Sequence, residues 1–448
     1  MGLESFFEPK SVAVIGASRE QGKLGHEILN NIIKAGFAGK IYPINPKADE
    51  ILGLKCYPSI KDVPEEVEMA VIIVPARFVL SVIADCGKRG VRAAVVISGG
   101  FRETGAAGEE LERQMLEAAK QAKIRIVGPN CQGVNSTAVG LCASWPLVKS
   151  KGTISAISQS GTIFAALECW AEDEGIGIRK FVALGNKCDV DEIELMEYLA
   201  EDEETKVIAL YIEGTRNGRK FIETLRSAVK SKPVLVLKGG RTGKGIQAAM
   251  SHTRSLVGKD SIFDVALRKA GAIRVYEIEE LYDACKAFAT LPLPKGDRVV
   301  IVTSSGGSGI LATDACEELG LNVIELSDEL REKLKSEMPP ECILRNPLDL
   351  TGSANSQTYD DALTILCDDG GIDSIIVIVG DPMPGIADVI ARHFSAGKTI
   401  VPVMLGGGHA EKEEREKMQK LHIPVYQSPT RAVRALAALT RYSKIRGG

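Results

Sequence analysis

The sequence has few aromatic residues, no long apolar run and no excess of positive charge, and each deficit excludes a class of protein. Phe, Trp and Tyr make up 5% of the 448 residues. The apolar stretch 71–80 is broken by Pro75 and Arg77, so it is too short to span a bilayer. The formal charge of −4 disfavours nucleic acid and anionic membranes as partners. With 45% apolar and 25% charged residues, the composition is typical of a globular α/β protein.

Cys-x-x-Cys pairs are also missing, although the chain has ten cysteines. The lack of this spacing argues against a zinc site or a redox motif. Most of the cysteines lie in apolar segments such as ALECW and LYDACKAF. The N-terminus has no basic region followed by an apolar one, as a secretory signal would. We therefore expect reduced, buried thiols, no metal site and a cytoplasmic location.

Short β-branched runs alternate with helical patterns along the whole chain, which predicts βαβ units. Runs such as SVAVIG, VIALYIEG and RVVIVTSS are apolar nearly throughout, as parallel strands buried on both faces are. The pattern is interrupted near 126–150 and at the proline-rich segment 290–297. The sequence therefore predicts an α/β fold of three consecutive doubly wound domains, at 1–127, 128–290 and 296–448.

Glycine-rich turns follow several predicted strands, at the sheet edge where open α/β folds bind ligands. The first lies between Gly16 and Gly25, at a helix start that suits a phosphate. A dinucleotide fingerprint requires glycine where Ser18 stands, and the next strand ends in Asn45-Pro46-Lys47 without the acidic residue of an NAD site. A cation there suits a phosphorylated ribose, as in NADP or coenzyme A.

Three further segments carry polar groups with two interpretations each. The turn SQSGT (158–162) lacks the glycines of a hydrolase elbow, so it forms either an oxyanion site or an ordinary helix cap. Glu213 ends a predicted strand and either orients an imidazole or is a solvated loop residue. His252 follows the glycine-rich run KGGRTGKG, where it is either an incidental surface residue or a group that must move.

Together these segments resemble the α-subunit core of the nucleoside-diphosphate-forming acyl-CoA synthetases, in the succinyl-CoA synthetase superfamily. The resemblance rests on the turns after the first strands and on GPNCQG, SQSGT, YIEG, SHTRSLVG, TSSGGSG and NPLDLTG. It implies a Rossmann-like CoA-binding domain followed by two flavodoxin-like domains. The histidine motif of the family is usually SHTGSLAG, and Arg254 stands where its glycine would be.

The resemblance implies an acid–thiol ligase that converts acyl-CoA, ADP and phosphate reversibly into carboxylate, CoA and ATP. The reaction proceeds through an acyl phosphate and a phosphohistidine on a mobile loop, with residues 239–245 as a flexible tether. His252 would be the phosphoryl carrier and Glu213 its orienting carboxylate. Phosphate would bind at Ser160, Gly161, Thr162 and Asn130. The CoA site would be formed by residues of four strand-end turns: Gly16, Ala17, Ser18, Gly22, Lys23, Asn45, Lys47, Val74, Pro75, Ala76, Arg77, Ser98 and Gly99.

No Walker-type phosphate loop and no nucleotide-grasping pattern is recognisable in the sequence. The resemblance therefore implies a partner, an ATP-grasp β subunit that binds ADP or ATP with Mg²⁺, in an α2β2 heterotetramer. A succinyl-CoA-type ligase subunit and a catalytically impaired, CoA-binding regulatory homologue stay open as alternatives. Ser18 disfavours a third, an NADP-dependent oxidoreductase.

Overall fold

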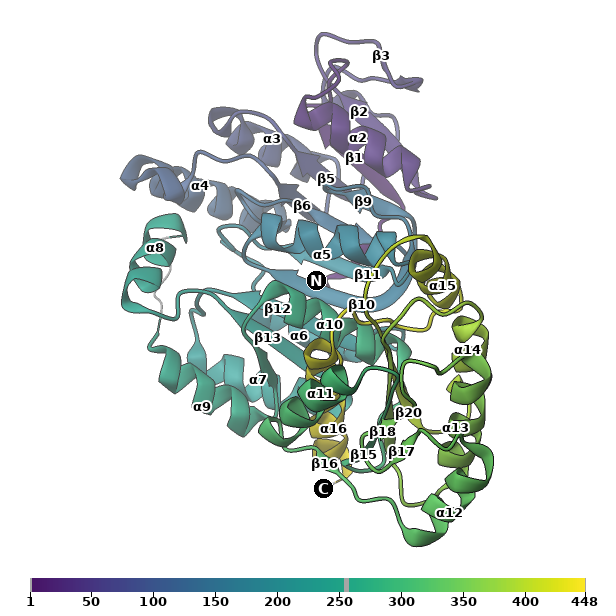
Figure 1. The fold of residues 1–448 in the computed structure, drawn as a ribbon. Helices are drawn as coiled ribbons and strands as arrows, with labels where there is room; N and C mark the ends of the chain where they lie inside the picture. The colour runs from purple at the N-terminus through teal and green to yellow at the C-terminus, as the bar shows by residue number, and fades with distance from the viewer. Residues whose placement is uncertain (1, 254–257, 448) are drawn as a thin grey trace. The chain divides into compact units, whose positions relative to one another are not determined.

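A computed structural model describes residues 2–253 and 258–447 of the chain, with side chains for all of these except 251–253. The chain divides into two compact units, Met1–Ile278 and Glu279–Gly448, and each is described by itself (Figure 1). Among the described residues, no helix combines the length and the apolar character that a membrane crossing requires.

The first sheet of unit 1 has five parallel strands in the order β2-β1-β5-β6-β7. Its strands are β1 (Ser11–Ile15), β2 (Lys40–Ile44), β5 (Met69–Ile72), β6 (Ala93–Val96) and β7 (Arg125–Val127). The helices between them are α2 (Leu24–Lys34), α3 (Ala76–Lys88) and α4 (Ala106–Ala122), and β3 (Glu50–Ile51) and β4 (Leu54–Lys55) form a small hairpin. Every residue of β1, β5 and β6 is buried, as their apolar runs predict. The strand order reverses between β1 and β5, which is the place where doubly wound sheets bind ligands.

The second sheet of unit 1 has the order β14-β13-β12-β10-β11-β8-β9. Strands β10 to β14 are parallel, and the short strands β8 and β9 extend the sheet antiparallel. The strands are β8 (Val134–Ser136), β9 (Leu141–Ala143), β10 (Lys151–Ser158), β11 (Ile178–Ala183), β12 (Val207–Ile212), β13 (Val234–Lys238) and β14 (Ile273–Val275). The helices are α5 (Gly161–Asp173), α6 (Glu192–Glu201), α7 (Gly218–Ser231), α8 (Gly243–Thr253) and α9 (Asp260–Ala270).

Polar contacts join these two sheets into one unit. The Arg125 guanidinium on β7 donates to Asp189 Oδ2 at 2.9 Å and to both Glu194 oxygens at 3.0 Å. On α2, Asn31 Nδ2 donates to the carbonyl oxygen of Ser144, beyond β9, at 2.9 Å. Such bonds between the two sheets explain why the first two predicted domains form one compact unit. The three-domain division stays a prediction.

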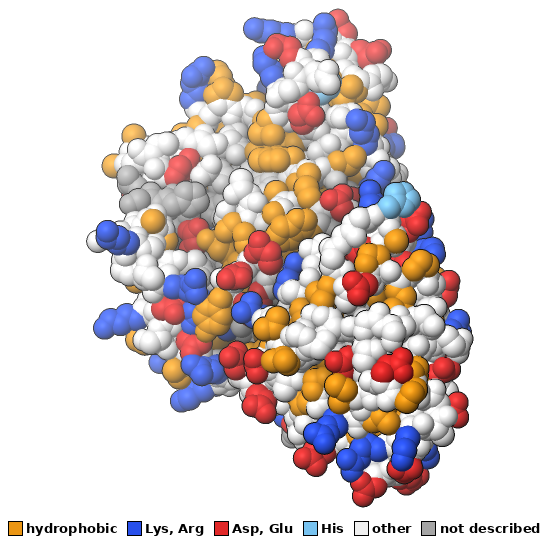
Figure 2. Space-filling view, in the orientation of Figure 1, with side chains coloured by type: hydrophobic (Ala, Val, Ile, Leu, Met, Phe, Trp, Pro, Cys, Tyr) orange, Lys and Arg blue, Asp and Glu red, His pale blue; other side chains and the backbone are white. Residues whose placement is uncertain are grey.

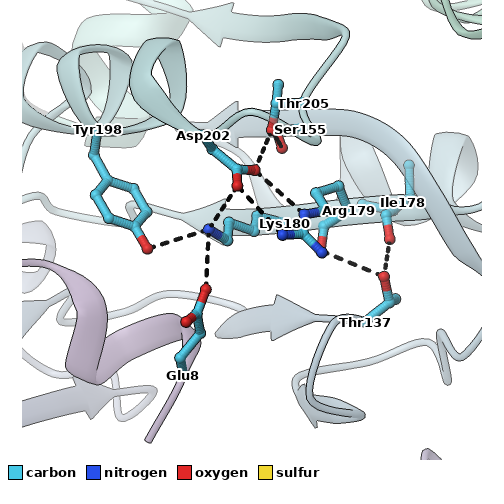
Figure 3. Close-up of polar contacts among 9 residues, drawn as sticks. All are labelled: Glu8, Thr137, Ser155, Ile178, Arg179, Lys180, Tyr198, Asp202 and Thr205. Carbon is cyan, nitrogen blue, oxygen red and sulfur yellow. Dashed lines mark hydrogen bonds and ion pairs between the residues drawn. The ribbon is translucent and has the colours of Figure 1, made fainter.

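The N-terminal helix α1 (Glu4–Phe7) is held against the second sheet by Lys180 of β11 (Figure 3). Lys180 is 2% exposed, and its Nζ lies 3.4 Å from Glu8 Oε1 and 3.4 Å from Asp202 Oδ1. The same ammonium donates to the Tyr198 hydroxyl at 3.2 Å. It also lies over the rings of Tyr198 and Phe7, which are stacked on each other. The cluster lies in the amino half of β11, so it fastens the start of the chain away from the strands' carboxyl ends.

Unit 2 contains a sheet in the order β17-β18-β15-β19-β20, with β16 beside β15. Its strands are β15 (Arg298–Thr303), β16 (Asn322–Val323), β17 (Ile343–Leu344), β18 (Leu348–Asp349), β19 (Ser374–Val379) and β20 (Thr399–Met404). Its helices are α10 (Ile278–Thr290), α11 (Gly306–Glu318), α12 (Asp328–Glu337), α13 (Ser356–Asp368), α14 (Ile386–Phe394), α15 (His409–Lys420) and α16 (Pro429–Gly447).

Helix α10 packs within unit 2, although the sequence assigns residues up to 290 to the middle domain. Arg431 on α16 binds Asp283 of α10 through two hydrogen bonds, of 2.6 and 2.9 Å. Lys286 Nζ donates to the carbonyl oxygen of Val425 at 2.9 Å. All residues of α10 from Leu281 to Ala289 are buried. A helix that is buried on all sides has no polar face to mark a domain surface in the sequence.

Candidate active site

The glycine turn after β1 is packed tightly against helix α2. Gly16 has a φ of 96°, which favours glycine. A Cβ on Gly25, in the first turn of α2, would lie 2.1 Å from the Gly16 carbonyl oxygen, so only hydrogen fits there. Asn45 Nδ2, after β2, donates to the Ala17 carbonyl oxygen at 2.7 Å. The turns after β1 and β2 are thus fixed to each other, with the exposed Lys47 beside them.

The turns after β5 and β6 are joined in the same way. Ser98 Oγ donates to the Val74 carbonyl oxygen at 2.5 Å. Glu103 Oε1 accepts from the backbone N–H groups of Gly100, at 2.6 Å, and of Phe101, at 3.0 Å. Since β2, β1, β5 and β6 are consecutive parallel neighbours, the four predicted turns lie along one sheet edge. The remaining predicted CoA residues lie on them, and five of these are exposed: Gly22, Lys23, Pro75, Arg77 and Gly99.

Helix α5 begins at Gly161 without a side-chain cap. Ser160 occupies the N-cap position, but its hydroxyl makes no capping bond and lies 3.4 Å from Thr162 Oγ1. The first helical N–H groups therefore lack the side-chain acceptor that an ordinary cap supplies. Together with two hydroxyls, they form a site that suits an oxyanion.

Glu213 lies beside this turn and is buried, with 4% of its surface exposed. Gln159 Oε1 accepts from the N–H groups of Glu213, at 2.7 Å, and Gly214, at 3.2 Å, and Gln159 Nε2 donates to the Gly214 carbonyl oxygen at 2.6 Å. The Tyr211 hydroxyl donates to Glu213 Oε1 at 3.3 Å. Burial and the nearby Glu213 carboxylate raise the pKa of Tyr211 above its usual value, so the phenol stays a donor. A solvated loop glutamate is excluded.

The segment that leads to His252 starts against Glu213. Gly239 N donates to the Ile212 carbonyl oxygen at 2.9 Å, and a Cβ on Gly239 would lie 2.5 Å from the Tyr211 hydroxyl and 3.4 Å from Glu213 Cγ. Helix α8 then begins at Gly243, where Thr242 Oγ1 accepts from Gly245 N at 3.1 Å.

The backbone of His252 is helical, where the sequence predicts an open loop. Its segment contains Ile246, Gln247, two alanines and Met250, which favour a helix over the preceding glycines. Of the predicted tether, residues 239–245, only the part before Gly243 lies outside helix α8. The side chain of His252 and all of Arg254 lie outside the described residues, so the pairing of His252 with Glu213 stays a prediction.

Asn130 lies with the CoA-side turns rather than with the phosphate turn. Its N–H donates to the Ser98 carbonyl oxygen at 2.9 Å, its φ is 56°, and its Oδ1 lies 3.2 Å from where a Cβ on Gly99 would be. Gln132, in the same GPNCQG motif, reaches α5 instead, since a Cβ on Gly161 would lie 2.5 Å from Gln132 Oε1. Gln132 Oε1 is buried and has no hydrogen-bond partner among the described residues. The phosphate role of Asn130 stays a prediction.

A buried carboxyl group also lies on α5, at Glu168, which is fully covered. Asn135 Nδ2 donates to Glu168 Oε1 at 2.7 Å, and the partners are amides rather than cations. Burial holds the pKa of Glu168 well above its usual range. The sequence analysis does not single out this residue, because an isolated glutamate in an apolar helix looks like a surface position.

In unit 2, the motifs TSSGGSG and NPLDLTG lie at the carboxyl ends of β15 and β18, which are parallel neighbours. A Cβ on Gly306, at the start of α11, would lie 2.9 Å from Asp349 Oδ2. In the described part of the chain, no three His, Cys, Asp or Glu side chains are grouped as metal ligands would be. All ten cysteines are free thiols, and most of them are buried. On the face in Figure 2, acidic and basic side chains are interspersed.

Three family models match the chain in succession. They are described as a CoA binding domain at residues 10–137, a succinyl-CoA ligase like flavodoxin domain at 151–288, and a ligase-CoA domain at 299–444. The order agrees with the predicted fold class, a Rossmann-like CoA-binding domain followed by flavodoxin-like domains, which is thereby confirmed.

Known proteins are similar over the whole length of the chain. It is 41% identical to the α subunit of ADP-forming acetate–CoA ligase I from Pyrococcus furiosus, over 99% of this chain and 98% of that one. It is 40% identical to ADP-forming acetate–CoA ligase I from Archaeoglobus fulgidus, over 99% of this chain but 64% of that longer protein. A solved structure of dinucleotide-forming acetyl-coenzyme A synthetase 1 from Ca. Korarchaeum cryptofilum, in complex with phosphate and ADP, matches with a TM-score of 0.93. The two chains are 37% identical and are covered to 99% and 97%.

Proposed function

We propose that this chain, which belongs to the family of ADP-forming acetate–CoA ligase α subunits, supplies the CoA site and the phosphate site of such a ligase. The reaction is the reversible conversion of an acyl-CoA, ADP and phosphate into a carboxylate, CoA and ATP. The observation that carries the proposal is the link between Gln159 and Glu213, which joins an uncapped helix N-terminus to a buried carboxylate. Both belong to the unit that contains the four linked turns of the CoA sheet.

The first chemical step uses the α5 terminus. Phosphate bound by the N–H groups of the first helical turn and by Ser160 and Thr162 would attack the acyl carbonyl carbon. The carbon–sulfur bond breaks, CoA leaves as the thiolate, and acyl phosphate forms. The helix dipole and the N–H groups stabilise the negative charge on the phosphoryl oxygens throughout this step.

The second step requires an imidazole with one unprotonated nitrogen. His252 would attack the phosphorus of the acyl phosphate, the carboxylate would leave, and the phosphoryl group would stay on the ring. Glu213 would accept a hydrogen bond from the other ring nitrogen and stabilise the positive charge of the ring. The burial of Glu213 and the nearby start of the segment leading to α8 support this assignment.

A partner subunit would complete the reaction. The Pyrococcus relative is named as a subunit α, and the Archaeoglobus relative is longer than the part that this chain matches. We propose that an ATP-grasp β subunit binds ADP with Mg²⁺ and takes the phosphoryl group from His252. An α2β2 heterotetramer in the cytoplasm is the assembly that this proposal implies.

The proposal is tested by reconstitution of the full chain with an ATP-grasp β subunit. ATP formation from ADP, phosphate and a panel of acyl-CoA thioesters is measured, and both succinyl-CoA and acetyl-CoA are included. We expect ATP formation with acetyl-CoA that depends on both chains. Binding of CoA without ATP formation from any thioester would favour the regulatory alternative, and preference for succinyl-CoA would favour the succinyl-type ligase.

A further inference from the structure

The loop between β11 and α6, residues 184–191, lies at the same sheet edge as the proposed site. Its side chains contact the CoA-side turns and the Glu213 turn. Asn186 and Lys187 are both 2% exposed, although they are polar loop residues. Loop residues are ordinarily at the surface, so two buried polar ones in succession indicate a specific role.

Asn186 faces the CoA side. Its Nδ2 donates to Glu103 Oε2 at 2.7 Å and to Glu112 Oε2 at 2.8 Å. The other carboxylate oxygen of Glu103, Oε1, accepts a hydrogen bond from the N–H of Gly100, in the turn after β6. Burial alone would raise the pKa of Glu103, but the hydrogen bonds from Asn186 and the backbone lower it, so the carboxylate remains an ionised acceptor.

Lys187 faces the Glu213 turn. Its Nζ donates to the Gly214 carbonyl oxygen at 2.6 Å and pairs with Glu192 Oε2 at 2.9 Å. Gln159 Nε2 donates to the same carbonyl oxygen. The carbonyl group of Gly214, the residue after Glu213, is therefore held by one side chain from the SQSGT turn and one from this loop.

The backbone of Lys187 shows that this arrangement costs free energy. Its φ is 47°, a left-handed conformation that residues other than glycine, asparagine and aspartate rarely adopt. Burial lowers the pKa of Lys187, against the opposing effect of Glu192. A strained backbone and a desolvated cation in one residue are typical of positions that serve a site.

We propose that Lys187 is a positioning residue that fixes the Glu213 turn for catalysis, and that Asn186 anchors the same loop to the CoA-side turns. Neither residue contacts the reacting atoms in this proposal. Lys187 acts by holding the Gly214 carbonyl oxygen, which sets the direction of the Glu213 carboxylate. The role for catalysis rests on the proposed function, because it assumes that Glu213 orients His252.

The chain offers a matched control in Lys180, a second buried lysine on the preceding strand. Lys180 is also 2% exposed and also pairs with a carboxylate, but its partners are the residues of Figure 3. Lys180→Met and Lys187→Met therefore remove the same kind of buried charge, one within β11 and one in the loop after it. A general loss of stability should affect both, whereas an effect on the Glu213 turn should follow Lys187 alone.

The first measurement is the rate at which acid-labile phosphate is incorporated from labelled ATP, with the full chain and its β subunit. We expect Lys187→Met to slow incorporation by about 10- to 100-fold. In Lys180→Met, both the CoA affinity and the rate of incorporation should stay within about threefold of wild type. Equal slowing in both variants, or a wild-type rate in Lys187→Met, would overturn the proposal.

Two further elements keep the test decisive. If Lys187→Met fails to fold because Glu192 is left unpaired, the double variant Lys187→Met/Glu192→Gln removes both charges and still lacks the donor to Gly214. The second measurement is hydrogen exchange at the N–H groups of Glu213 and Gly214, which needs no activity. We expect about tenfold faster exchange in the Lys187 variants and not in Lys180→Met. Unchanged exchange in the Lys187 variants would refute the positioning role, whether or not the wild-type chain incorporates label. If the wild-type chain incorporates no label, the proposed function is refuted instead.

Discussion

The side-chain oxygen of Gln159 accepts a hydrogen bond from the backbone N–H of Glu213 at 2.7 Å, although the two residues are 54 positions apart in the sequence. The bond connects the residue before an uncapped helix start with the residue that follows β12. The proposed anion site and the Glu213 carboxylate are thereby held together through one side chain. A supporting hydrogen bond of this kind fixes the geometry of a functional site.

We expect Gln159→Leu to weaken both the fold and the use of phosphate. The variant leaves two buried N–H groups and one carbonyl group without the Gln159 partner, at a cost of about 1–3 kcal/mol each, offset in part by the bond that Lys187 keeps. The Glu213 turn would also move relative to α5, so the KM for phosphate should rise. Urea unfolding and initial rates over a phosphate series measure the two effects. Gln357→Leu, an exposed site on α13, is the control, and equal behaviour of the two variants would contradict the prediction.

Glu213→Gln should slow phosphorylation of the chain while leaving its stability nearly unchanged. The amide keeps the shape and still accepts from Tyr211, but it cannot stabilise an imidazolium ion. A loss of about 10²- to 10⁴-fold in the rate is expected, as for other groups that support proton transfer. The measurement is incorporation of acid-labile label from ATP with the β subunit present. A wild-type rate would show that Glu213 plays no part.

The companion variant His252→Ala should abolish that label altogether. His422→Ala, at an exposed position of unit 2, is its control and should incorporate label normally. Label that persists in His252→Ala would show that another residue carries the phosphoryl group.

The fold could be predicted because its signals are local. The buried strands β1, β5, β6 and β12 are apolar nearly throughout, and each appears as a continuous run in the sequence. The turns of the CoA sheet follow from strand order once parallel strands are assumed. The domain boundary near residue 290 rests on the proline-rich segment, which is a local signal, and it stays a prediction, although α10 packs within unit 2.

The site could be predicted only in part, because its remaining residues act through long-range contacts. Asn186 and Glu103 are 83 positions apart, and no pattern around either indicates the other. In GPNCQG, Gln132 is the side chain that reaches the start of α5, and no pattern in the sequence distinguishes it from Asn130, whose phosphate role stays a prediction. The helix at His252 was missed because the glycines before it suggested a longer loop.

Lys47→Glu should weaken CoA binding and reduce its dependence on salt. Lys47 is exposed beside the linked turns after β1 and β2, where we expect it to attract a phosphorylated ribose. Calorimetry with the full chain should show a Kd about tenfold higher at low ionic strength, and a smaller difference at high salt. The control is Lys34→Glu, an equal change of charge in the last turn of α2, at the opposite end of the helix from the glycine turn. Equal losses in the two variants would mean that only net charge matters, and binding of NADP in place of CoA would overturn the ligand assignment.

Glu168→Gln tests the electrostatics beneath the phosphate turn through the pH dependence of stability. Burial raises the pKa of Glu168 in the folded chain, so the native state binds a proton that the unfolded chain releases above about pH 4.5. Its contribution to the free energy of unfolding is therefore greatest at low pH and declines as the pH rises towards the folded-state pKa. Glutamine has the same shape and no proton to lose, so the variant should gain stability relative to wild type as the pH rises above about 5.

The measurement for Glu168→Gln is urea unfolding of both proteins at several pH values in that range, with exposed Glu109→Gln as the control. The difference in unfolding free energy between Glu168→Gln and wild type should increase steadily with pH, and the corresponding difference for Glu109→Gln should stay flat. A constant difference for Glu168→Gln would mean that the Glu168 carboxyl group is ionised in the folded chain at pH 5 and above. Asn135, which donates to it at 2.7 Å, would then stabilise a buried carboxylate on the helix that begins at the proposed phosphate site.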